Sequence, residues 1–241
     1  MAAAIPEYPE ESPQGCLGGP WWIEVGGQDL QRGRLVRAFI PHVDQEPRQL
    51  TLVGRTEATE HGSARYAIEP LRIGGPRSAP RLPVAAMPTY EGEVHAVYRA
   101  KVRPALVLSA PTPEVPKALR TGAAGWQTSP TLLVAPYYGV DPGGRRGGWR
   151  EEFVDRIRRG EYPQYLWDKL PLGGAQESIL RLDHVQPVGR HANACAPTAY
   201  CLSDDALDVL DEWFEWLWTG LVRTDGVLAM IRGHLLGPSV G

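Results

Sequence analysis

The sequence predicts a mainly β protein that ends in a helix, and three observations support this fold class. The 241 residues include 27 glycines and 23 prolines, which break the chain into short segments and leave little room for long helices. Several short runs are rich in β-branched and apolar residues, as strands are. A long run with helical periodicity occurs only near the C-terminus, after Ser203.

Two of the predicted strands are continuous apolar runs, ALVLS at residues 105–109 and TLLVAP at residues 131–136. Runs without alternation are typical of strands that are covered on both faces. Glycine opens a third strand at Gly33, and a fourth, SILRLDHVQPV, carries a polar interruption. The third and fourth strands are predicted over residues 33–43 and 178–188, further strands over 50–54, 66–73 and 92–98, and a long loop over residues 74–88.

Helical spacing is present in three segments. Residues 149–160 place Phe153 and Ile157 on one face, and Gly160 is a natural stop. The C-terminal helix begins after Ser203, a good N-cap, and its apolar face is broadened by tryptophans. Core packing explains such a face, and a partner surface is the alternative. A short helix is predicted over residues 227–236.

Composition excludes several classes of protein. The net charge of −3 gives no overall excess for nucleic-acid binding, so such a surface would be a local patch. Three cysteines form no disulfide framework, which favours the cytoplasm. Cys195, Cys201 and His191 lack a fourth zinc ligand, so no metal or cofactor is expected. Neither a signal peptide nor a run long enough to span a bilayer is recognised, so no membrane partner is expected.

Arg103, in the segment KVRPALVLS at residues 101–109, is a candidate functional residue. Because Pro104 follows it, this arginine has an extended backbone at the entry to a buried strand. A permanently charged guanidinium there suits the binding of a phosphate and of a phosphorane-like transition state. A surface salt bridge is the ordinary alternative.

Five elements resemble, in order, those of the PemK/MazF toxin family. They are the strand that glycine opens at residue 33, RPALVLS, a strand ending in VAP, the segment SILRLDHV, and the capped terminal helix. The resemblance implies an SH3-like small barrel of the PemK/MazF/CcdB-like kind, usually dimeric, with an RNA-cleaving activity. The barrel would span residues 21–221 with large insertions at about 44–90 and 139–172, between a flexible arm (1–20) and a tail (222–241).

The resemblance assigns the family's catalytic arginine to Arg103 and places Tyr138 where the family has a threonine. Cleavage of RNA through a 2′,3′-cyclic phosphate needs a base, an acid and a cation, and needs no metal. His95, on the preceding strand, is the candidate acid or base because its ordinary pKa lies near neutrality. His184 and His191 are weaker candidates.

Residues 143–169 interleave arginines with aromatic residues. Arginines bind phosphates and aromatic rings stack on unpaired bases, so the segment is a candidate surface for single-stranded RNA. Acidic residues dilute its charge, and an exposed helix with pairs at i and i+4 is the alternative. The candidate RNA-binding residues are Arg145, Arg146, Trp149, Arg150, Arg158 and Arg159.

Three functions therefore remain open. The first is a growth-inhibiting endoribonuclease, working on single-stranded RNA as a homodimer and paired with an antitoxin. The second is a catalytically inactive module of the same fold that binds nucleic acid or protein. The third is a subunit that docks through the tryptophan-rich helix into a larger toxin–antitoxin or defence complex.

Overall fold

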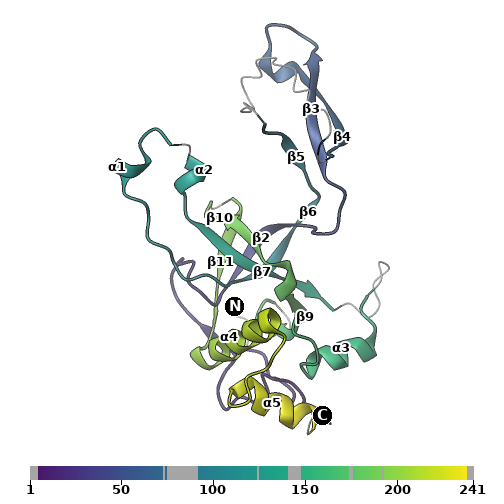
Figure 1. The fold of residues 1–241 in the computed structure, drawn as a ribbon, viewed down its shortest axis with the longest axis vertical. Helices are drawn as coiled ribbons and strands as arrows, with labels where there is room; N and C mark the ends of the chain where they lie inside the picture. Colours follow the sequence, from purple (N-terminus) through teal and green to yellow (C-terminus); the bar gives the residue numbers. More distant parts are fainter. Residues whose placement is uncertain are drawn as a thin grey trace. The chain divides into compact units, whose positions relative to one another are not determined.

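The computed structural model describes residues 5–72, 74, 92–123, 125–140, 148–173, 176–191 and 193–237. The chain divides into a larger unit, Met1–Phe39 with Val102–Gly241, and a smaller unit, Ile40–Lys101. Figure 1 shows their strands and helices. Among the described residues, no helix is both long enough and apolar enough to cross a membrane.

An eight-stranded sheet forms the framework of the larger unit. Its strand order is β1-β11-β2-β6-β7-β9-β8, with β10 paired to β7. The strands are β1 (Trp22–Glu24), β2 (Arg34–Pro41), β6 (Ala100–Val107), β7 (Thr131–Gly139), β8 (Tyr165–Leu170), β9 (Gln176–Arg181), β10 (Gln186–Gly189) and β11 (Cys195–Leu202). The predicted mainly β class is confirmed.

Gly33 joins three of these strands. Its N–H donates to the Val107 carbonyl, and its own carbonyl accepts from Leu202, so the turn into β2 is tied to β6 and β11. Its φ of +80° favours glycine, and a Cβ would meet Leu207 Cδ2 at 3.1 Å and Cys201 Sγ at 3.2 Å. Glycine is therefore required at the start of this strand for both conformation and space.

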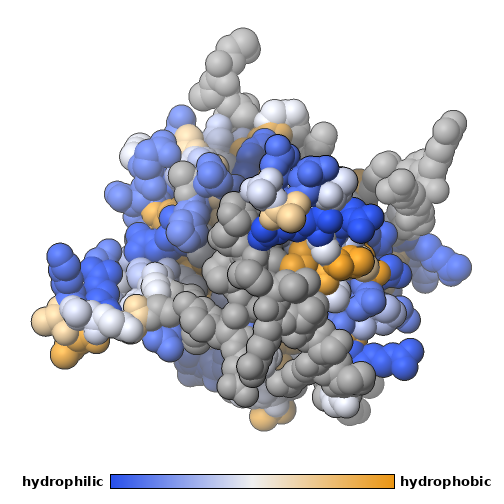
Figure 2. All heavy atoms as spheres, turned by 90° about the horizontal axis from the view of Figure 1, so that it is seen from above, coloured by the Kyte–Doolittle hydropathy of each residue, from blue (hydrophilic) through white to orange (hydrophobic). Residues whose placement is uncertain are grey.

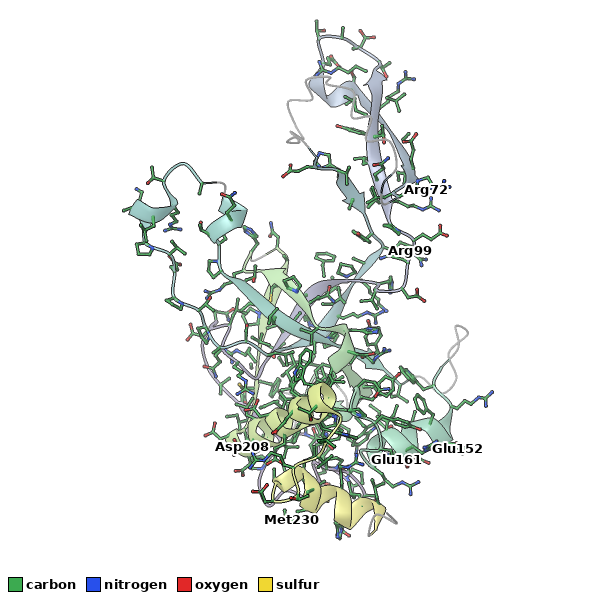
Figure 3. All side chains as sticks on the ribbon, in the orientation of Figure 1. Arg72, Arg99, Glu152, Glu161, Asp208 and Met230 are labelled. Atoms are coloured by element: carbon green, nitrogen blue, oxygen red, sulfur yellow. The ribbon has the colours of Figure 1, made fainter. Side chains whose placement is uncertain are left out.

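Two helices near the C-terminus contribute buried residues to the core of the larger unit. Ser203 caps α4 (Asp204–Thr219) by accepting from the Ala206 N–H, and Gly220 ends it in the left-handed conformation. The C-terminal helix is thus confirmed, and Figure 3 places Asp208 on α4 and Met230 on α5. The other helices are α1 (Lys117–Arg120), α2 (Gly125–Thr128), α3 (Glu151–Arg158), α5 (Val227–Leu236) and two 3-10 turns, η1 (His61–Ser63) and η2 (Leu182–His184).

Aromatic residues contribute much of the core. Trp21, Trp22 and Trp213 are each at most 1% exposed and belong to one hydrophobic cluster of the larger unit. Leu228 and Ile231 join the same cluster from α5, so residues that the sequence analysis assigns to a tail contribute to the core. The buried indoles need hydrogen-bond acceptors, because an indole N–H is always a donor.

Trp213 Nε1 donates to the Pro163 carbonyl at 3.0 Å, and the Asp168 carboxylate on β8 is the acceptor for Trp21 and Trp22. It is fully buried and accepts from Tyr8 Oη at 2.7 Å, Trp22 Nε1 at 3.2 Å, Tyr137 Oη at 2.9 Å and Trp21 Nε1 at 3.3 Å. Burial raises the pKa of Asp168 to about 6, and the four donors oppose that rise. One carboxylate therefore joins the N-terminal segment to β1, β7 and β8.

Described residues of the N-terminal segment contact β8, within the stretch 1–20 for which the sequence predicts a flexible arm. Besides the Tyr8 hydrogen bond, Lys169 donates to the Glu7 carbonyl at 3.0 Å, and Gln14 donates to the Trp167 carbonyl. Ser12 and Gln14 are almost completely buried. Residues 5–20 therefore lie along β8, a contact that no local pattern in a Pro- and Glu-rich segment reveals.

The smaller unit holds a three-stranded antiparallel sheet in the order β4-β3-β5. Its strands are β3 (Arg48–Arg55), β4 (Ala64–Pro70) and β5 (His95–Val97). The unit includes the insertion predicted at 44–90, and the predicted strands at 50–54 and 66–73 overlap β3 and β4. Residues 75–88 of the predicted loop lie outside the described residues.

Candidate functional site

Arg103 and Tyr138 lie together in the larger unit. They occupy the adjacent antiparallel strands β6 and β7, in which Ala105 pairs with Pro136. The Arg103 guanidinium carbon lies 4.4 Å from the centre of the Tyr138 ring. A cation over an aromatic face at this distance is attracted by about 0.5–2 kcal/mol. The structure thus brings together two of the three predicted catalytic residues.

Three further side chains near this pair come from the end of β9 and from the turn η2 that follows it. Arg181 ends β9, and Asp183 and His184 lie in η2, where a continuous strand is predicted over 178–188. Arg181 donates to both carboxylate oxygens of Asp183, at 2.8 and 2.7 Å. The Tyr138 hydroxyl lies 3.0 Å from His184 Nδ1. We call Arg103, Tyr138, Arg181, Asp183 and His184 the Arg–Tyr–His cluster.

The hydrogen bonds of His184 define its tautomer. Arg181 Nη2 lies 2.6 Å from His184 Nε2, and a guanidinium can only donate, so Nε2 carries the lone pair. In the neutral ring the proton is then on Nδ1, which donates to the Tyr138 hydroxyl oxygen. The hydroxyl hydrogen of Tyr138 is left to point at another acceptor.

Burial and charge set the protonation states of the cluster. Burial lowers the pKa of His184, and the positive charge of Arg181 lowers it further. Burial raises the pKa of Tyr138, although Arg103 and Arg181 oppose the rise. Burial alone would raise the pKa of Asp183, but the hydrogen bonds and charge of Arg181 hold it below its ordinary value. At neutral pH the histidine is therefore neutral, the phenol protonated and the carboxylate ionised.

The cluster has a surplus of positive charge. Two guanidiniums approach the Tyr138 ring, with carbons at 4.4 Å for Arg103 and 6.0 Å for Arg181, and one carboxylate opposes them. Arg103 Nε is buried and has no hydrogen-bond partner in the part of the chain that the structure describes. A buried donor without an acceptor is unfavourable, so an oxyanion that reached Arg103 would satisfy it.

Aromatic side chains continue from the cluster toward α3. The Arg181 guanidinium lies 4.8 Å from the centre of the Tyr165 ring. Tyr165 is in edge contact with Trp149 at 5.8 Å and with Phe153 at 5.7 Å, and Trp149 stacks on Phe153. These rings are only partly buried, so some of their surface faces solvent.

The predicted RNA-binding residues have different surroundings. Arg145 and Arg146 lie outside the described residues. Arg150 is the exposed N-cap residue of α3, and Arg159 is the exposed residue at its end. Arg158 is engaged within the fold: it pairs with Asp155 and Glu177 at 3.1 and 3.5 Å and lies over the Trp167 ring. Acidic residues lie within and just after the helix as well, and Figure 3 labels Glu152 in α3 and Glu161 after it.

His95 belongs to β5 of the smaller unit, whereas Arg103 and Tyr138 belong to the larger one. The histidine that contacts Tyr138 is instead His184, which the sequence analysis ranks below His95. Arg181 was not identified as a site residue. The polar interruption in SILRLDHVQPV was the signal that pointed to this segment.

Arg34, at the start of β2, is a buried arginine with a structural role. It follows Gly33, where the resembled family has an acid, and it is 1% exposed. Its guanidinium donates to the carbonyls of residues Asp29, Gly27 and Gly26 at 3.0, 2.9 and 3.2 Å. Arg34 therefore holds the loop before β2.

In the described part of the chain, no three His, Cys, Asp or Glu side chains come together as metal ligands. Comparison of the chain with protein-family models, with curated proteins and with solved structures returns no match.

Proposed function

We propose that this chain is a PemK/MazF-like endoribonuclease that cleaves single-stranded RNA without a metal ion and leaves a 2′,3′-cyclic phosphate. The observation that carries the proposal is the Arg–Tyr–His cluster, in which two guanidiniums surround a phenol bonded to a neutral histidine. This reaction needs cations that stabilise the pentavalent phosphorane and side chains that transfer protons.

The proposed step begins when the scissile phosphate draws Arg181 away from His184. Nε2 of His184 then accepts the proton of the 2′-hydroxyl, whose oxygen attacks phosphorus. Nδ1–H of His184 passes its proton to the Tyr138 oxygen, and Tyr138 gives its hydroxyl proton to the departing 5′-oxygen. The P–O5′ bond breaks, and the products are a cyclic phosphate and a 5′-hydroxyl.

Arg103 has the electrostatic role in this step. Its buried Nε lacks an acceptor among the described residues, so a phosphate oxygen would fill that position. Arginine is preferred to lysine here because its planar fork binds two oxygens at once and stacks on Tyr138. The partly exposed rings of Trp149 and Tyr165 would stack on bases next to the cleaved bond.

The family likeness and the SH3-like barrel belong to the same proposal. In its support, the strands that carry three of the resembling segments, β2, β6 and β7, are neighbours in the sheet. A homodimer, a cytoplasmic location and an antitoxin or other protein partner are the remaining parts of the proposal. They follow from the resemblance.

The test is incubation of the purified chain with a labelled oligoribonucleotide in EDTA, with the product masses measured. Arg103→Ala, Tyr138→Phe and His184→Gln should each lower the cleavage rate about a hundredfold or more. Arg223→Ala, at a half-exposed site on the turn before α5, is the matched control and should cleave like the wild type. An uncut RNA, or cleavage that Arg103→Ala leaves unchanged, contradicts the proposal.

A second candidate, an RNA-binding module without catalysis, is favoured by one observation. Arg181 is already bound to Asp183 through two hydrogen bonds and occupies His184 Nε2, the atom that would act as the base. If that arrangement persists on RNA, the cluster binds phosphate and does not cut. RNA binding that Arg103→Ala weakens, with no product formed, would identify this case.

A further inference from the structure

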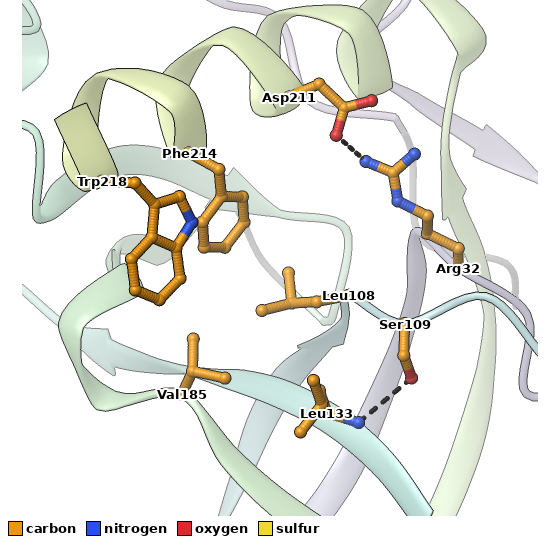
Figure 4. Close-up of a pocket in the computed structure, with 8 residues that line it drawn as sticks. All are labelled: Arg32, Leu108, Ser109, Leu133, Val185, Asp211, Phe214 and Trp218. Carbon is orange, nitrogen blue, oxygen red and sulfur yellow. Dashed lines mark hydrogen bonds and ion pairs between the residues drawn. The ribbon is translucent and has the colours of Figure 1, made fainter. Parts of the chain in front are cut away.

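An apolar groove lies between α4 and the strands beneath it. Its walls are Leu108, Leu133, Val185, Phe214 and Trp218, and it holds a volume of about 290 Å³. Figure 4 shows the two aromatic rings of α4 on one side and the three aliphatic side chains on the other. This volume is at the lower end for small-molecule sites, and it suits a few side chains of a bound segment.

The groove is open to solvent. The side chain of Trp218 is 75% exposed and that of Leu133 is 45% exposed, and Leu221, just beyond α4, is 74% exposed. On the face that Figure 2 shows, the coloured residues are largely hydrophilic and the hydrophobic ones lie in separate areas. Exposed large apolar side chains that line a hollow are typical of a docking site.

A stripe of negative charge leads along α4 to this groove. Asp204, Asp208, Asp211 and Glu215 follow one another at spacings of four, three and four, and Trp218 comes three residues later. Residues with these spacings share one helix face. The helix has six carboxylates and no lysine or arginine. We call this face the acidic stripe.

The acidic stripe is unfavourable for the helix by itself, because like charges three or four residues apart repel. Asp211 forms an ion pair with Arg32 at one end of the groove, as Figure 4 shows. Asp208 and Glu215, on either side of it, are exposed. A cationic partner would relieve this repulsion while its apolar side chains filled the groove.

We propose that the groove and the acidic stripe together bind a basic amphipathic segment of another protein. Its apolar side chains would lie against Trp218 and Leu133, and its lysines or arginines would face Asp208 and Glu215. RNA is disfavoured at this face because carboxylates repel phosphates. A second copy of the chain is disfavoured because a two-fold interface would set one acidic stripe against the other. The proposal does not depend on RNA cleavage.

The experiment measures fluorescence anisotropy of a labelled synthetic peptide that forms a helix with leucines on one face and lysines on the other. The full chain should bind it, and more weakly as salt rises. One control peptide has glutamate in place of each lysine. The other has the same residues in an order that gives no apolar face. Both should bind at least about tenfold more weakly.

Protein variants locate the binding. Trp218→Ala should weaken peptide binding about tenfold or more, because it removes the large exposed aromatic of the groove. Glu215→Lys should weaken it and reduce its salt dependence. Met230→Ala, at a 64% exposed residue of α5, and Glu151→Lys on α3 are the controls. Unchanged melting temperatures would show that the variants are folded.

Three results would overturn the proposal. The first is an unbound lysine peptide. The second is a lysine peptide that binds Trp218→Ala as tightly as it binds the wild type, or a glutamate peptide that binds the wild type as tightly as the lysine peptide does. The third is light scattering that shows a dimer dissolved by Trp218→Ala, because the groove would then bind a second copy of the chain.

Discussion

Asp168→Asn tests the hydrogen-bond centre of the larger unit. The carboxylate has one phenol and one indole donor on each oxygen: Tyr8 with Trp22, and Tyr137 with Trp21. Asparagine keeps one oxygen, so either orientation of the amide turns its NH₂ toward one indole. A phenol can accept a hydrogen bond instead, but an indole N–H cannot.

The magnitude follows from these contacts. One buried indole left without an acceptor costs about 1–3 kcal/mol. The two hydrogen bonds that remain lose their charge assistance, which adds about 1 kcal/mol. Relief of the buried charge offsets part of this sum. We therefore expect Asp168→Asn to lower the free energy of unfolding at pH 7 by about 2–4 kcal/mol.

Urea titration followed by tryptophan fluorescence measures this loss in the right part of the molecule. All eight tryptophans lie outside residues 40–101, so the signal reports the larger unit alone. Asp208→Asn, at an exposed site, is the control and should change the free energy by less than about 0.5 kcal/mol. A loss below about 1 kcal/mol for Asp168→Asn would refute the reasoning.

Two further predictions concern pH and the opening of β2. Because the folded pKa of Asp168 is about 6, above the ordinary 3.8, the folded protein holds this proton where the unfolded chain has lost it. Stability from this group should fall by about 3 kcal/mol as pH rises from about 4 to 6, then level off. The difference in the free energy of unfolding between the wild type and Asp168→Asn, measured across this pH range, isolates the contribution of Asp168. A difference that does not change with pH contradicts the prediction. Gly33→Ala should lower the free energy of unfolding by about 1–3 kcal/mol, because φ is +80° and a Cβ would crowd Leu207 and Cys201. A lower urea midpoint measures this loss, and an unchanged midpoint would show that the turn relaxes.

Elements with a strong local pattern were predicted well from the sequence. The apolar run at 131–136 covers most of β7, the run at 105–109 overlaps the end of β6 at residues 105–107, and the short helix predicted at 227–236 coincides with α5. Three strands were not predicted, β1, β8 and β11. β8 contains a buried Asp168 and β11 contains Pro197, so neither has the apolar alternation of a strand. β11 pairs with β1 and β2, which are distant in sequence, and Asp168 of β8 accepts hydrogen bonds from Tyr8 and Trp22; a local pattern contains none of these contacts.

The candidate site was predicted in part for the same reason. Arg103 was identified from its strand and Tyr138 from the family resemblance, and their strands are adjacent. His184 ranked below His95, and residues 178–188 were predicted as one strand with a polar interruption. The turn η2 breaks that strand and brings the histidine to the Tyr138 hydroxyl. The turn, and with it the catalytic proposal, depends on tertiary contacts.

The pairing of β1 with β11 has a consequence for biosynthesis. β1 lies at one end of the sheet order, and its partner is the last strand to leave the ribosome: Trp22 is opposite Leu202. Two adjacent tryptophans that end up buried must therefore wait until about five-sixths of the chain has been translated. Such long-range closure slows folding and lengthens the exposure of apolar surface. Because Trp213 of α4 and Leu228 of α5 belong to the same core, the larger unit should finish folding only after these helices have been translated.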